Sequence, residues 1–192
     1  VYKRQLHYAY PNHFPMELLS VIRRHDNICN YMDIALQHIS DNVLTRMQRH
    51  TTRRETLELL EAMRREVPGI CLRTTLMVGF PGETEAEAME TVDLVRQVEF
   101  DALFTFIFSP RPGTPAAKMD DPVPRAEKQK WFDRLCDAQN RISEEIHAGY
   151  VGDTLRCLID GESDDSRWPL TARTAGGRLV HLVGSPDAVG TY

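Results

Sequence analysis

The first two thirds of the chain alternate short apolar runs with amphipathic segments. Four runs have the length and the aromatic and β-branched content of strands: 5–10, 31–36, 70–80 and 101–108. The segments between them repeat apolar residues every three to four positions, as helices do: 15–25, 40–47, 52–67 and 84–98. Strand and helix in this rhythm indicate βαβ units and a parallel sheet. Right-handed crossovers would bend that sheet into an arc or part of a barrel.

The pattern changes after residue 108. Residues 109–124 contain five prolines and predict an irregular loop, which a long helix over 124–148 follows. From Gly149 onward, glycine turns separate three short strand-like runs: 153–161, 169–174 and 178–184. The sequence therefore predicts a second, small all-β domain, with the boundary near 147–150.

Composition excludes few functions. The chain has 192 residues, is 42% hydrophobic and 27% charged, and carries a net charge of −5, which gives no general electrostatic reason to bind nucleic acid. No apolar run approaches a membrane span, and no secretory signal is visible. The four cysteines lack the short spacing of a zinc or iron–sulfur loop, so we expect reduced, packed thiols: Cys29, Cys71, Cys136 and Cys157.

Polar residues and glycines gather where three predicted strands end. Gln37, His38 and Ser40 follow the second strand, and "VGFPGET" follows the third. Ligands of parallel α/β folds bind at the carboxyl ends of strands, and glycines there let the backbone approach them. A plainer interpretation is also open, in which Ser40 caps a helix, His38 is a buried imidazole and the glycines serve a turn.

The fourth strand carries Phe104, Phe106 and Phe108 on one face, which is consistent with core packing or with a ligand surface. Ser109 and Arg111 follow in the proline-rich loop. Arg111 is either a solvated charge or a contact for phosphate.

Several segments together resemble one family. "LQHISD", "LRTT", "VGFPGETE" and "SPRPGTPAAKM" occur in order, and "YVGDTLRCLIDG" and "TARTAGGRLVHLVG" come after them. These segments resemble the methylthiotransferases of the radical S-adenosylmethionine (SAM) enzymes, from about Leu6 to the end of the chain. The resemblance implies an α/β fold made of the C-terminal part of a partial (β/α) barrel at 6–147. A truncated, OB-like TRAM domain would occupy 148–192.

The same resemblance implies the cofactors SAM and two [4Fe–4S] clusters, with a 5′-deoxyadenosyl radical as the reactive species. The family's CxxxCxxC motif would lie upstream of residue 6, so none of the four cysteines is a metal ligand and the chain by itself is expected to be inactive. The positions that match SAM contacts are Gln37, Ser40, Arg54, Thr75, Gly79, Gly82, Glu83 and Phe106. The candidate contacts for RNA are Ser109, Arg111, Arg156, Arg167, Arg173 and Arg178.

The substrate is expected from the branch of the family. Residues 6–84 resemble the branch that modifies an aspartate of ribosomal protein S12. Residues from about 90 resemble the branch that adds methylthio to C2 of N6-isopentenyladenosine in tRNA, next to the anticodon. We expect tRNA as the partner, with S12 as the alternative, in the cytoplasm and without membrane or DNA partners. A third possibility is an inactive fragment that only binds RNA through its TRAM domain.

The first residues, "VYKRQ", can be encoded by a string that resembles a sequencing adapter. We interpret residues 1–5 as a cloning scar. The change of branch near "GFPGETE" further suggests a join between two genes. The final "AVGTY" is expected to open a closing strand of the TRAM domain.

Overall fold

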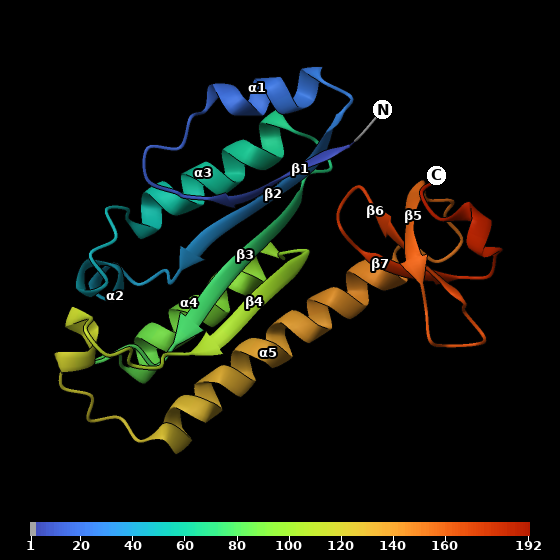
Figure 1. The fold of residues 1–192 in the computed structure, drawn as a ribbon. Helices are drawn as coiled ribbons and strands as arrows, with labels where there is room; N and C mark the ends of the chain where they lie inside the picture. The colour runs from blue at the N-terminus through green and yellow to red at the C-terminus, as the bar shows by residue number, and fades with distance from the viewer. Residues whose placement is uncertain (1–2) are drawn as a thin grey trace.

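The computed structural model describes residues 3–192 as two sheets joined by one long helix (Figure 1). The first part contains β1 (Arg4–Ala9), α1 (Glu17–Arg24), β2 (Ile28–Gln37), α2 (Asp41–Arg46), α3 (Arg53–Glu66), β3 (Cys71–Val78), α4 (Glu85–Val98) and β4 (Ala102–Ile107). The remainder contains η1 (Pro115–Lys118), α5 (Arg125–Ala148), β5 (Cys157–Glu162), β6 (Leu170–Thr174), β7 (Leu179–Leu182) and η2 (Pro186–Ala188). The scar interpretation stays a prediction: residues 1–2 lie outside the described residues, and Arg4 and Gln5 begin β1.

The large sheet is parallel throughout, with strand order β1-β2-β3-β4. Alternate residues of β3 are buried, from Leu72 to Val78, and they join a core with residues of α1, α3, α4 and α5. The helices therefore cover one face of the sheet. The opposite, inner face carries part-exposed side chains such as Thr75 and Met77. The α/β fold class predicted from the apolar rhythm is confirmed.

Capping residues explain where two helices begin. Thr52 and Glu55 form a reciprocal capping box at the start of α3, and Thr84 and Glu87 form one at the start of α4. Each box satisfies backbone N–H groups that the first helical turn leaves without partners. The turn residues after β3 thereby fix the direction in which the chain leaves the sheet.

The long helix α5 extends the core of the large domain. Trp131 and Leu135 of α5 are buried in the same cluster as Phe100, which is fully buried. The small domain has its own antiparallel sheet in the order β5-β6-β7, where Leu170 and Ala172 are fully buried. The domain boundary stays a prediction.

Several element boundaries differ from the sequence prediction. β2 begins at Ile28, three residues early, because Arg4 of β1 pairs there. β5 begins at Cys157, after turns around residue 150, and the proline-rich loop contains the short helix η1. The final residues lie beside β5, where the N–H of Gly190 donates to the carbonyl of Ile159 and the N–H of Ile159 donates to that of Thr191. Across residues 3–192, no helix has the length and apolar character needed to cross a membrane.

The burial of Phe100 gives a stability prediction. Phe100→Ala removes a fully buried ring and should lower the free energy of unfolding by about 3–5 kcal/mol, because the core cannot collapse fully around the cavity. Phe104→Ala is the matched control: its ring is 57% exposed and its removal should cost about 1 kcal/mol or less. Urea unfolding followed by circular dichroism measures both, and equal losses would contradict the assignment of the core.

Candidate functional site

Three strands end at one edge of the large sheet. β2 ends at Gln37, β3 at Val78 and β4 at Ile107. Gln37 has a φ of +71°, a left-handed conformation that residues other than glycine seldom adopt. Such a residue keeps this conformation only where the surrounding structure imposes it, which is common at ligand sites. The backbone strain and the position both mark Gln37 as a functional candidate.

A groove of about 280 Å³ opens at this edge. One side consists of Gln37 and residues 46–49 at the end of α2, and the other side consists of residues 114–116 and 119 of the loop before α5. Met77 and Phe80 lie between them. The lining combines amide and guanidinium groups with proline, alanine and methionine. It therefore suits a ligand that has both charged and apolar parts.

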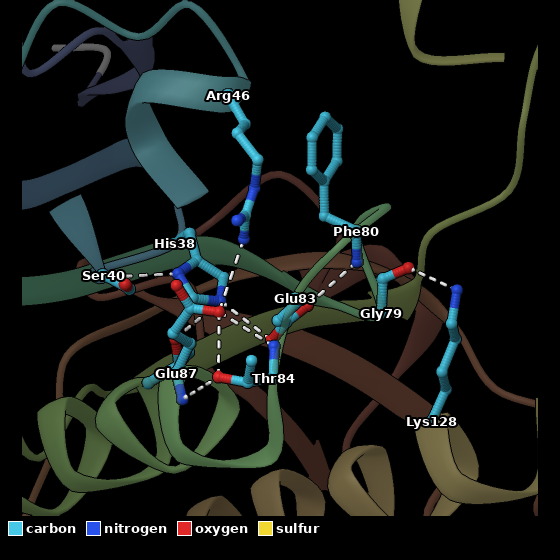
Figure 2. Close-up of polar contacts among 10 residues, drawn as sticks. His38, Ser40, Arg46, Gly79, Phe80, Glu83, Thr84, Glu87 and Lys128 are labelled. Carbon is cyan, nitrogen blue, oxygen red and sulfur yellow. Dashed lines mark hydrogen bonds and ion pairs between the residues drawn. The ribbon is translucent and has the colours of Figure 1, made fainter. Parts of the chain in front are cut away.

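A buried hydrogen bond joins the loops that follow β2 and β3. The Nε2 atom of His38 lies 3.0 Å from Oε1 of Glu83, and both side chains are fully buried. The backbone N–H of Ser40 donates to Nδ1 of His38 over 3.0 Å. Since Nδ1 accepts, the ring proton resides on Nε2, which donates to the Glu83 carboxylate. Figure 2 shows this contact between the two loops.

The Glu83 carboxylate also holds its own loop. Its Oε2 atom accepts the backbone N–H of Phe80 over 2.9 Å, and Thr91 lies 3.3 Å from Nε2 of His38. Every polar atom of this pair therefore has a partner, as burial requires. The sequence left open whether His38 is a rim residue or a buried imidazole, and in the structure its imidazole is buried.

A lysine of α5 ties a third segment to the same edge. Nζ of Lys128 donates to the carbonyl of Gly79 over 2.8 Å and to Oδ1 of Asp121 over 2.6 Å. Gly79 has a φ of +78°, and a Cβ atom there would lie 2.6 Å from Cδ of Lys128. Glycine is needed for both reasons. Figure 2 shows the contact between Lys128 and Gly79, and the contact with Asp121 anchors the loop before α5 beside the groove.

Two arginines of the groove were not identified from the sequence. Arg46 and Arg49 line it, and each has a buried Nε atom with no hydrogen-bond partner in the described part of the chain. Nη2 of Arg49 donates to the carbonyl of Ala35, and its guanidinium carbon lies 4.4 Å from the centre of the Tyr10 ring. Burial lowers the pKa of Arg49, so an anion in the groove would offset the cost of desolvating this cation. The feature of the sequence that could have identified them is the basic run "RMQRH", which starts at the last residue of α2.

Arg46 also supports the start of α4. Its Nη2 atom lies 3.4 Å from Oε2 of Glu87, the capping residue. Burial raises the pKa of Glu87, but the hydrogen bonds from Thr84 and the nearby Arg46 guanidinium together hold it below its usual range. The Cβ that Gly82 lacks would lie 3.8 Å from Cζ of Arg46, so the predicted residue Gly82 borders this pair.

The predicted SAM positions divide into three groups. Gln37 lines the groove, and Thr75 and Phe106 lie on the inner face, where Phe106 pairs with Met77. Four others support the site from beneath or beside it: Ser40, Gly79, Gly82 and Glu83. Arg54 lies apart, with its side chain 83% exposed on α3 and 3.9 Å from Glu58.

The predicted RNA residues are spread over the molecule. Ser109 and Arg111 are exposed in the loop after β4. Arg156 stacks over Tyr192 at 4.3 Å, whereas the other arginines of the small domain pair with acids. These pairs are Arg167 with Asp165, Arg173 with Asp160 and Arg178 with Asp101.

No metal centre is formed by residues 3–192: no three His, Cys, Asp or Glu side chains gather where they could hold an ion. The residues present therefore do not fit a [4Fe–4S] cluster.

Comparison with known proteins defines the class of this chain. Residues 6–95 match the Radical SAM superfamily. Coproporphyrinogen III oxidase (HemN) from Escherichia coli, a radical SAM enzyme, shares the fold over 93% of this chain and 40% of its own, with a TM-score of 0.56 and 18% identity. Streptococcus suis SuiB gives a TM-score of 0.50 with 11% identity, covering 72% of this chain and 30% of its own.

Relatives with higher sequence identity are named as methylthiotransferases, a narrower class than the Radical SAM superfamily. The ribosomal protein uS12 methylthiotransferase RimO of Bacteroides fragilis is 54% identical over 81% of this chain, and that of Phocaeicola vulgatus is 51% identical over 84%. The tRNA-2-methylthio-N(6)-dimethylallyladenosine synthase of Clostridioides difficile is 40% identical over 93%. The chain spans 36%, 38% and 37% of these three relatives' lengths. The chain is thus similar to radical SAM methylthiotransferases, which confirms the resemblance seen in its motifs.

The His38–Glu83 contact gives a second stability prediction. His38→Ala leaves a buried carboxylate without its main donor and should lower the free energy of unfolding by about 2–4 kcal/mol. The exposed His25 provides the control His25→Ala, which should change it by less than about 0.5 kcal/mol. Denaturant unfolding at pH 7 measures both variants. A His38→Ala variant as stable as the wild type would show that the two loops are held by other contacts.

Proposed function

We propose that this chain is part of a radical SAM methylthiotransferase and that its rim groove holds SAM. The observation that carries the proposal is the groove itself, in which an amide and two arginines with unpartnered Nε atoms face methionine and phenylalanine. SAM combines an amino acid carboxylate with an adenosine, so it presents the anionic and flat apolar parts that this lining suits. When bound beside a cluster, SAM supplies radical chemistry and a methyl group.

Within the groove, each residue has a proposed task. Arg49 would hold the carboxylate through its free guanidinium N–H groups, in place of the Arg54 suggested by the sequence. Gln37 would donate and accept hydrogen bonds at the strand end, and Phe106, beside Met77 on the inner face, would contact the adenosine. The loop anchored by Lys128 would exclude water from the groove.

For the substrate, we infer a protein side chain of ribosomal protein S12 as the first candidate. The support is the higher identity to enzymes with that name, 54% against 40%. tRNA is the second candidate, supported by an alignment over 93% of this chain. Under the tRNA proposal, Arg156 and Arg173 of the small domain would contact phosphates, as would Ser109 and Arg111 of the exposed loop. The cytoplasm as location and a TRAM-type small domain also remain proposals.

The role of Arg49 is tested by binding. S-adenosylhomocysteine, which keeps the adenosine and the carboxylate, is titrated calorimetrically into the purified chain. Arg49→Ala should weaken binding by about 10- to 100-fold, since a charge-assisted hydrogen bond contributes about 1.5–3 kcal/mol. Arg54→Ala is the matched control and should leave the affinity unchanged. The opposite ranking of the two variants would restore Arg54 as the carboxylate contact.

A segment exchange with a relative tests which substrate is modified. Residues 6–162 replace the matching segment of the Bacteroides fragilis relative, and S12 and tRNA are offered side by side to the reconstituted chimaera. We expect methylthio incorporation into S12. Modification of tRNA alone would overturn that order, and incorporation into neither, with the parent enzyme active, would count against the proposed function.

A further inference from the structure

Residues 174–178 form a turn, named here the docking turn, that contacts the large domain. This turn connects β6 to β7 and lies at the amino-terminal end of the large sheet, opposite the rim groove. Figure 1 shows the small sheet beside the end of α5 and near the start of β1. Several contacts join the turn to the large domain or to the end of α5.

Two contacts depend on glycine. A Cβ atom at Gly176 would lie 2.4 Å from Sγ of Cys71, so the backbone of the turn rests directly on that thiol. A Cβ at Gly177 would lie 3.1 Å from Nε2 of Gln5, which donates to the carbonyl of Ala175 over 3.0 Å. Larger side chains at these positions would separate the two domains.

The other contacts gather on Arg178. Its Nη2 atom donates to Oδ1 of Asp101, and its Nη1 atom lies 3.1 Å from Nε2 of His147 at the end of α5. Its guanidinium also lies 5.1 Å from the centre of the Tyr150 ring. The Arg178 side chain is only 11% exposed. A partly desolvated arginine that uses both ends of its guanidinium and an aromatic face is fixed in one geometry.

The acceptor Asp101 is itself held in place. Its Oδ2 atom accepts the backbone N–H of Leu72 over 2.8 Å, and its backbone N–H donates to the carbonyl of Leu72. Asp101 thus belongs to the framework of β3 and β4, and the ion pair with Arg178 connects that framework to the small sheet.

We propose that the docking turn locks the small β domain against the large sheet, and that Arg178 is a positioning residue rather than a contact for RNA. In the locked position, Arg156 and Arg173 line a cleft of about 610 Å³ between the domains, together with Gln5, Leu158 and Tyr192. The docking turn thus fixes the orientation of Arg156 and Arg173 relative to the large domain, whichever substrate the complete enzyme uses. The inference therefore stands independently of the proposed function.

The alkylation rate of the Cys71 thiol shows whether the docking turn covers it or has moved away. Burial and the nearby Asp101 raise the pKa of Cys71 to about 11. At pH 8 its thiolate fraction should be roughly 100-fold below that of a cysteine with the ordinary pKa, and iodoacetamide should react correspondingly slowly. The rate should then rise about tenfold per pH unit towards pH 11. Mass spectrometry of the Cys71 peptide measures this rate, and Cys136, on the large domain, serves as an internal reference.

Arg178→Ala tests the proposal in the same assay. The Arg178 cation favours the Cys71 thiolate, so its loss without opening would slow the alkylation. Opening would expose the thiol and accelerate alkylation by at least about tenfold, with Cys136 unchanged. Loss of charge alone therefore predicts slower alkylation of Cys71, whereas opening of the lock predicts faster alkylation. Arg167→Ala, on an exposed arginine of the same domain, is the matched control and should change neither rate.

A further variant completes the test. Gly176→Val should accelerate Cys71 alkylation by steric displacement alone, with every charge retained. Asp101 is kept in every variant, because its carboxylate raises the pKa of the Cys71 thiol and its loss would accelerate alkylation without opening. Circular dichroism melting shows whether each variant remains folded. Folded variants in which Cys71 reacts no faster than in the wild type would overturn the lock.

Discussion

The hydrogen bond between His38 and Glu83 joins the two loops from which the rim of the sheet is built. Both side chains are fully buried, so neither can exchange its partner for water, and breaking the contact would leave a buried carboxylate. Gln37 immediately precedes His38, and Gly79 lies four residues before Glu83. The strained backbone of Gln37 and the tight turn at Gly79 therefore depend on the same contact, and so does the groove between them.

The groove combines a fixed side and a loop side. Residues 46–49 follow a short helix that the Arg46–Glu87 pair connects to α4. The loop side lacks regular structure apart from η1, and Lys128 anchors it through Asp121. A site of this kind presents charge from the rigid framework and apolar surface from the loop. That division fits a ligand whose charged group must be oriented while the remainder is covered.

The two ends of the large sheet serve different purposes. The carboxyl ends of the strands carry the groove, and the amino ends carry the docking turn beneath Cys71 and Asp101. Both ends use glycine where a backbone approaches a side chain closely, at Gly79 against Lys128 and at Gly176 against Cys71. Close approach of this kind leaves no space for a Cβ atom, so these glycines are required by packing across elements that are far apart in the sequence.

The sequence by itself determined the α/β class, the order of helices and strands and the family resemblance, because each depends on local periodicity or on short motifs. It also placed Gln37, Gly79 and Glu83 at one edge, since parallel strands end together. Only the tertiary structure showed that Arg49 lines the groove while Arg54, five residues later, lies exposed on α3. It also assigned Arg178 to Asp101, 77 residues away in the chain. Such contacts depend on how whole elements pack, and no local pattern encodes them.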